Sequence, residues 1–218
     1  MLPLPWQGPA MRILAIETAT DVLSVALFDG GNLVAWDYRE PGRGHAEQLV
    51  PAIAALPDCG RANQILVSLG PGSFTGVRIG LAAARALGLA WGASVIGFST
   101  LALVAASTRG SSDEPVTVCM KAGHGEWLLQ SFAANGEPHG PFSTVRPEDA
   151  AYLLKAAPRD FVGDRAEVAA QLVAGGRARD GRPDARFALE LHGTTLFTEL
   201  QPLYARPPDA VLPSALSA

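Results

Sequence analysis

A glycine-rich segment, GPGSFTG at residues 70–76, follows a short apolar run and precedes a helical pattern. Glycines between a strand and a helix N-terminus let backbone N–H groups approach an anion, so the segment is a candidate phosphate site. It fits neither standard nucleotide motif. A Walker loop needs Lys after its last glycine, where this chain has Val77-Arg78, and the dinucleotide fingerprint needs two residues between its second and third glycines, where this chain has three. We favour the alternative, in which the glycines allow tight packing of the strand against the helix.

Carboxylates that could serve such a site are scarce. No Asp or Glu occurs from residue 59 to residue 112, a stretch that holds four arginines, so no metal-binding or ribose-binding carboxylate can come from it. Glu17 and Asp21 follow the first apolar run, where a carboxylate could hold a metal–phosphate group. We favour a role for them in a turn and a helix cap.

Histidine and hydroxyl side chains form no catalytic or metal-binding pattern. His45 begins HAEQL, which resembles a helical metal motif with His at i and i+4, but position 49 is Leu. The other histidines are far apart and lack paired ligand spacing: His124, His139 and His192. Ser73 and Thr75 lack the surroundings of a nucleophile elbow. We therefore predict no metal, no cofactor and no catalytic residue.

The segment VRIGLAAARALGLA, residues 77–90, predicts a helix with small residues on one face. Gly76, Gly80, Ala84 and Gly88 recur at spacing four. Interior Gly costs roughly 1 kcal/mol relative to Ala, so the backbone on this face is expected to approach another element closely. The spacing leaves open whether that element belongs to the same chain or to another one.

The elements before this helix predict a partly parallel sheet. Residues 12–20 and 23–40 indicate a three-stranded meander, and residues 45–56 indicate a helix that Pro51 should kink or delay. An apolar run at 65–69 leads into the glycine segment, so strand, loop, helix and strand follow the order of a βαβ unit.

Residues after the polar stretch at 109–115 predict a second lobe. Three strand patterns are followed by a helix, a short strand and another helix, and residues 177–186 are expected to form a loop. The lobes are predicted at 11–110 and 111–206, with an extension at 1–10 and a proline-containing tail at 207–218.

Composition indicates a globular protein. Of 218 residues, 48% are hydrophobic and 17% charged, and the net charge of -4 argues against tight, nonspecific binding of nucleic acid. The two cysteines, Cys59 and Cys119, are expected to be reduced thiols. Residues 1–10 do not resemble a secretory signal. Residues 86–106 are uncharged and raise the possibility of a membrane span, but helix, strand and helix account for them equally well, and no basic cluster flanks them.

Several strings together resemble the bacterial TsaB family, also called YeaZ. They are ILAIETATDVLSVAL, HAEQLVPAI, GPGSFTGVRIG, VIGFSTLALVA, KAGHGEW and PLYAR, in that order between residues 11 and 206. The chain departs from the family pattern at Glu17, where Asp is usual, and in the short linker at 57–64, which lacks an acidic pair. The extension at 1–10 has no counterpart.

The resemblance implies an α/β fold of the actin-like, hsp70-like, sugar-kinase-like (ribonuclease H-like) class, with two small lobes and mixed sheets. It implies a cytoplasmic role in forming threonylcarbamoyladenosine next to the anticodon of tRNA. In that role the chain is a noncatalytic partner of the transferase TsaD, its paralogue, with a TsaE-like ATPase in a larger complex and no membrane. tRNA is bound only through the complex, and the isolated chain could form a homodimer. The alternative is an ATP- or metal-dependent enzyme of the same fold, kinase-like or glycoprotease-like, in which Glu17 and the glycine segment hold the ligand.

Family resemblance also points to helices 45–56 and 77–90 as the partner-binding face. The small-residue stripe permits close helix approach, and the apolar positions of the first helix supply a surface that a partner could cover. The predicted partner-binding residues are Leu49, Ile53, Leu56, Gly80, Leu81, Ala84, Arg85 and Gly88.

Overall fold

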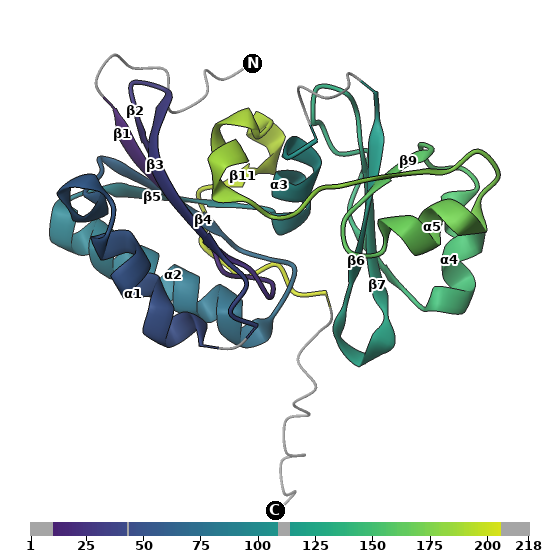
Figure 1. Ribbon diagram of the computed structural model, residues 1–218, viewed down its shortest axis with the longest axis horizontal. Coiled ribbons are helices and arrows are strands. Elements are labelled where there is room, and N and C mark those ends of the chain that lie inside the picture. The colour runs from purple at the N-terminus through teal and green to yellow at the C-terminus, as the bar shows by residue number, and fades with distance from the viewer. Residues whose placement is uncertain (1–10, 43, 109–113, 206–218) are drawn as a thin grey trace, which may run out of the picture.

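Two mixed β-sheets organise the chain in a computed structural model that describes residues 11–42, 44–108 and 114–205 (Figure 1). In spatial order the first sheet contains β11 (Leu196–Phe197), β5 (Ser94–Phe98), β4 (Gln64–Ser68), β1 (Arg12–Glu17), β2 (Leu23–Asp29) and β3 (Asn32–Arg39). The second contains β10 (Arg177–Arg179), β9 (Asp160–Val162), β6 (Val116–Lys121), β7 (Trp127–Phe132) and β8 (Ser143–Val145).

The first sheet confirms the predicted meander and βαβ unit. Strand β1 pairs antiparallel with β2, β2 pairs antiparallel with β3, and β1 and β5 both pair parallel with β4. Gly30 and Gly31 have positive φ in the turn between β2 and β3, a conformation that glycine adopts at little cost. Strands β1 and β4 are almost entirely buried because helices cover both faces of the sheet.

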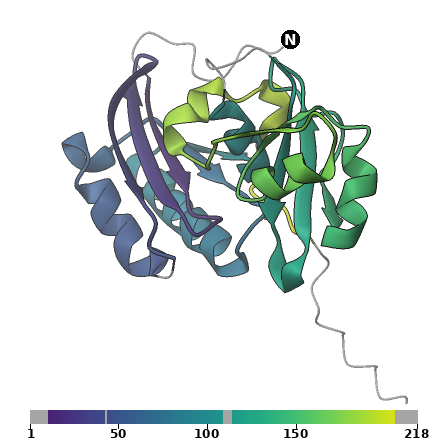
Figure 2. The same cartoon turned by 45° about the vertical axis from the view of Figure 1, so that its right-hand side comes forward.

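Helices α1 (His45–Ala54) and α2 (Phe74–Trp91) cover one face of this sheet, and α3 (Thr100–Ala106) covers the other (Figures 1 and 2). A short 3-10 turn, η1 (Pro57–Gly60), connects α1 to β4. Helix α1 begins at His45 and continues through Pro51, so the expected delay of the helix does not occur.

The second sheet is covered on one face by α4 (Pro147–Leu154) and α5 (Ala166–Leu172), which enclose a separate apolar cluster. The prediction of a loop at residues 177–186 was wrong for its first three residues. Arg177–Arg179 form β10, which pairs parallel with β9. Asp160 in β9 is buried and forms ion pairs with Arg177 and Arg179. These ion pairs fix β10 beside β9, although the sequence Arg-Ala-Arg has none of the β-branched or aromatic residues that favour a strand.

The end of the described chain returns to the first sheet. The 3-10 segment η3 (Ala185–Glu190) packs against α3, and β11 pairs with β5 after η4 (Gly193–Thr195). The predicted lobe at 111–206 therefore contributes elements to both sheets. The extension at 1–10, the boundary near residue 110 and the tail at 207–218 lie outside the described residues.

Helix α3 joins the two sheets through a shared apolar core. Leu101 and Val104 in α3 belong to the same buried cluster as Val118, Met120 and Phe132 in the second sheet. Residues 86–106, whose composition alone would allow a membrane span, form the end of α2, strand β5 and α3. Among the described residues, no helix has both the length and the apolar character needed to cross a membrane.

Candidate functional site

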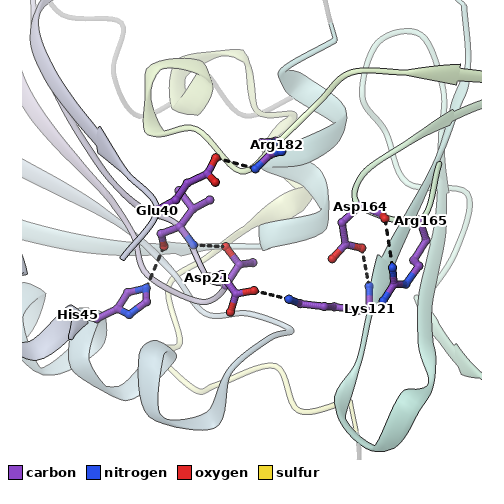
Figure 3. A network of polar contacts seen from close by, with 9 residues as sticks. Asp21, Glu40, His45, Lys121, Asp164, Arg165 and Arg182 are labelled. Carbon is purple, nitrogen blue, oxygen red and sulfur yellow. Dashed lines mark hydrogen bonds and ion pairs between the residues drawn. The ribbon is translucent and has the colours of Figure 1, made fainter. Parts of the chain in front are cut away.

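A cleft of about 1450 Å³ lies between the two sheets. Two ion pairs connect its walls, as Figure 3 shows: Lys121 with Asp21, and Arg182 with Glu40 at 2.6 Å. The backbone N–H of Lys121 also donates to Asp164 Oδ1 at 2.8 Å. Charges of both signs therefore line the cleft, and two ion pairs join its walls.

The glycine segment packs against the residues that follow β1. A Cβ atom on Gly72 would lie 2.0 Å from the carbonyl oxygen of Ala19, and one on Gly76 would lie 2.1 Å from that of Thr18. Ser73 N–H donates to Ala19 O at 2.6 Å, and Thr18 Oγ1 donates to Gly76 O at 2.8 Å. These contacts support the packing interpretation, because the two segments can approach this closely only without side chains at Gly72 and Gly76.

Glu17 lies inside the first lobe, beneath the glycine segment. Its Oε1 accepts the Ala19 N–H at 2.5 Å and its Oε2 accepts the Thr100 hydroxyl at 3.4 Å. Burial raises the pKa of the Glu17 carboxyl to about 7, against the opposing hydrogen bonds from Ala19 and from the hydroxyls of Ser68 and Thr100. By accepting the Ala19 N–H, Glu17 stabilises the turn after β1, in agreement with the structural role favoured from the sequence.

Glu17 and Asp21 do not form a common site. Asp21 is exposed and pairs with Lys121 across the cleft, whereas Glu17 is fully buried. Within residues 11–42, 44–108 and 114–205, no three His, Cys, Asp or Glu side chains are grouped so that they could hold a metal ion.

The histidines and cysteines have structural surroundings. His45 Nε2 lies 3.1 Å from Val22 O and links the start of α1 to the start of β2 (Figure 3). His192 accepts the Thr194 N–H at the start of η4. Cys59 and Cys119 are both free thiols, and burial raises the pKa of Cys119 to about 12.

The small-residue stripe of α2 faces its own sheet. A Cβ on Gly80 would lie 2.4 Å from Thr18 Oγ1, and one on Gly88 would lie 2.7 Å from Val95 Cγ2. Ala84, between them, is fully buried. The element that α2 approaches closely is therefore the sheet of the same chain, which corrects the expectation that the stripe contacts a partner.

The other predicted partner-binding residues need the same correction, with one exception. Leu49, Ile53, Leu56 and Leu81 are buried in the core between the helices and the first sheet. The apolar stripe of an amphipathic helix packs on its own domain first, so these side chains present no surface to a partner. Arg85 is exposed, and its Nη2 donates to Leu200 O at 2.9 Å.

A different set of apolar side chains lies on the outer surface of α1 and α2. Leu89 is 88% exposed and Val50 is 60% exposed. Pro51, Ala54, Ala82 and Ala86 are also exposed on these two helices. Helices α1 and α2 are in contact, and these exposed apolar side chains on the two helices are here called the α1–α2 surface.

Phe74, Arg78 and Tyr204 form an aromatic–arginine cluster in the lining of the cleft, which the sequence did not predict. The Arg78 guanidinium carbon lies 3.2 Å from the centroid of the Phe74 ring, and the Phe74 and Tyr204 rings stack at 6.1 Å. The spacing of Phe74 and Arg78 could have indicated a contact along a helix. Nothing in the sequence indicated that Tyr204, far along the chain, would join them.

Comparisons with known proteins identify relatives. A family model described as TsaD, tRNA N6-adenosine threonylcarbamoyltransferase, matches residues 39–139. The tRNA threonylcarbamoyladenosine biosynthesis protein TsaB of Escherichia coli is 38% identical over 138 residues, which are 60% of this chain and 59% of the relative. The TsaB protein of Bacillus subtilis is 36% identical over 104 residues, 45% of each chain. Both matches span less than two thirds of the relative's length.

Solved structures resemble a larger part of the chain. A Pseudomonas aeruginosa protein described as similar to peptidase YeaZ has a TM-score of 0.71 and 27% identity, covering 90% of this chain and 100% of that one. YeaZ from Pseudomonas aeruginosa has a TM-score of 0.69 at 24% identity, covering 89% and 99%. The α/β fold of the actin-like, sugar-kinase-like class, with two mixed sheets, is thereby confirmed.

Proposed function

We propose that this chain, which resembles proteins of the TsaB (YeaZ) family, acts in tRNA threonylcarbamoyladenosine biosynthesis as the noncatalytic partner of a TsaD-like paralogue. The names of its relatives in Escherichia coli and Bacillus subtilis support the pathway. The match of residues 39–139 to the TsaD model supports kinship with the transferase itself. In this proposal the complex also includes a TsaE-like ATPase and works in the cytoplasm.

Two features support a noncatalytic role. The glycine segment uses its backbone to pack on Thr18 and Ala19. Glu17 is buried beneath that segment, away from the cleft. The glycine backbone and the carboxylate that a kinase-like enzyme would turn toward its nucleotide thus contribute to this chain's own packing.

The α1–α2 surface is the proposed contact with the TsaD-like paralogue, and the exposure of Leu89 is the observation that carries it. A leucine that is 88% exposed contributes little to the stability of an isolated chain, and contiguous exposed apolar groups mark interaction surfaces. The helices are those expected from the resemblance, but the contacting residues are the exposed ones, Val50 and Leu89 with their alanine neighbours, in place of the buried stripe.

Substitution of Leu89 tests this assignment. Leu89→Glu places a charge in the proposed contact and should weaken copurification with the TsaD-like paralogue of the same organism at least tenfold, because an unpaired charge is costly to bury. Tyr152→Glu is the matched control, since Tyr152 is 78% exposed on α4 of the other sheet. Both variants should keep the parent's melting temperature. Undiminished binding by Leu89→Glu and Val50→Glu would exclude the α1–α2 surface, and a homodimer lost in Leu89→Glu would assign the surface to a second copy.

A further inference from the structure

The aromatic–arginine cluster formed by Phe74, Arg78 and Tyr204 has no assigned role in the proposed partner contact. It lies on the side of α2 that faces residues 200–204, because Arg78 Nη2 donates to Tyr204 Oη at 2.5 Å and Arg85 donates to Leu200 O. All three side chains line the rim of the cleft.

Large aromatic surface stays open to solvent in this cluster. Phe74 is 61% exposed even with the Arg78 guanidinium stacked on its ring, and Tyr204 is 42% exposed. The two rings are within 29° of parallel. Burial of exposed aromatic carbon is favourable. A flat ligand that covers the rings would therefore gain hydrophobic free energy on binding.

The charge of Arg78 defines the kind of ligand. Arg78 donates to Phe74 O at 3.1 Å and to Tyr204 Oη, both neutral acceptors, and it takes part in no ion pair among the described residues. A cation beside exposed, nearly parallel rings matches a nucleobase attached to a phosphate, since bases stack on aromatic and guanidinium planes.

We propose that Phe74, Arg78 and Tyr204 form a stacking site for one unpaired base of an RNA strand. The identification of that RNA as tRNA rests on the proposed function, whereas the stacking chemistry does not. A duplex is a poor ligand because its bases are already stacked on each other. Affinity comes from stacking more than from phosphate contacts, because acidic side chains line the rest of the cleft alongside basic ones.

Fluorescence anisotropy with the full chain and a labelled, unstructured ten-nucleotide RNA tests the site. Phe74→Ala and Tyr204→Leu should each weaken binding about 5- to 100-fold, the usual range for loss of one base–aromatic stack. Tyr204→Phe keeps the ring and should bind within about twofold of the parent. Tyr152→Ala, which removes an exposed aromatic ring outside the cleft, should have no effect. The slope of log affinity against log salt should be near that of a single phosphate contact, about -0.7.

Three results would overturn the proposal. They are unchanged affinity in Phe74→Ala and Tyr204→Leu, equal affinity for the same sequence as a duplex, and much tighter binding of AMP than of the strand, which would assign the site to a free nucleotide. Binding of the TsaD-like paralogue is measured on the same variants. If Phe74→Ala loses that partner while RNA binding is unchanged, the rings belong to a protein interface and the RNA site is wrong, although the proposed function stands. If the parent chain binds the RNA but no such paralogue, the proposed function fails and the stacking site stands.

Discussion

At the scale of single residues, the buried carboxyl of Glu17 has a cost that depends on pH. A chain of hydrogen bonds leads to it from the glycine segment: Gly70 N–H donates to Ser68 Oγ, which lies 2.6 Å from Thr100 Oγ1, which donates to Glu17 Oε2. These bonds do not offset the loss of hydration, since burial raises the pKa of Glu17 from 4.5 to about 7. Between pH 4.5 and 7 the folded chain binds more protons than the unfolded chain, so stability falls as pH rises through this window.

Glu17→Gln should therefore stabilise the chain at pH 8 and change its stability little at pH 4.5. The expected gain at pH 8 is on the order of 3 kcal/mol, the free energy equivalent of the pKa shift. Urea unfolding at the two pH values measures it. Glu199→Gln, at an exposed position outside the helices and strands, is the control and should change stability by less than about 0.5 kcal/mol. A variant at Glu17 with the same pH dependence as the parent would show that Glu17 does not titrate in this window.

At the scale of elements, the stripe on α2 determines how closely the helix lies on β1, β4 and β5. Ala84→Leu inserts a bulky group where the parent has no space, so overpacking should destabilise the isolated chain by about 1–3 kcal/mol or more. Chemical denaturation of the purified chain measures this loss. Ala86→Leu, at an exposed position two residues later, is the matched control and should stay within about 0.5 kcal/mol of the parent. A stable Ala84→Leu variant that fails only in partner binding would restore the original assignment of the stripe to an interface.

The small-residue stripe on α2 is a feature that spacing locates in the sequence without identifying its neighbour. The spacing of Gly80, Ala84 and Gly88 establishes that something approaches α2 closely, and both a sheet of the same chain and a helix of another chain satisfy it. Apolar runs and the glycine turn between β2 and β3 predict the meander of β1, β2 and β3 well, because local patterning decides those strands. Local patterning misses β10, whose Arg177 and Arg179 are held by Asp160, a contact between residues far apart in sequence.

The candidate site shows the same limit over longer distances. The glycine segment and its neighbouring helix could be located from sequence because each is a local pattern. The stacking of Tyr204 on Phe74 and the pairing of Asp21 with Lys121 depend on the return of the chain to the first sheet and on the relative position of the two sheets. No local propensity encodes such contacts.

At the scale of the whole molecule, the cleft between the sheets is bordered by two ion pairs and by the glycine segment at 70–76, whose backbone packs on Thr18 and Ala19. Lys121 and Asp21, and Arg182 and Glu40, satisfy one another across it, and the shared core of α3 with β6 and β7 fixes the sheets on its inner side. Exposed ion pairs contribute little stability, so they do not themselves exclude a ligand. What the cleft lacks, among the described residues, is a grouped set of metal ligands with which to hold a nucleotide's metal.

We therefore expect the isolated chain to bind Mg-ATP weakly or not at all. A kinase-like relative would present glycine N–H groups and a carboxylate to the phosphates and metal, whereas here Ser73 N–H donates to Ala19 O and Glu17 lies in the interior. Titration calorimetry of the purified chain with ATP, with and without Mg²⁺, should show no saturable heat in the micromolar range, while the TsaE-like ATPase in the same buffer serves as the positive control. Saturable binding that requires Mg²⁺ would mean that the cleft rearranges to release these groups, and it would favour the kinase-like enzyme over the noncatalytic partner.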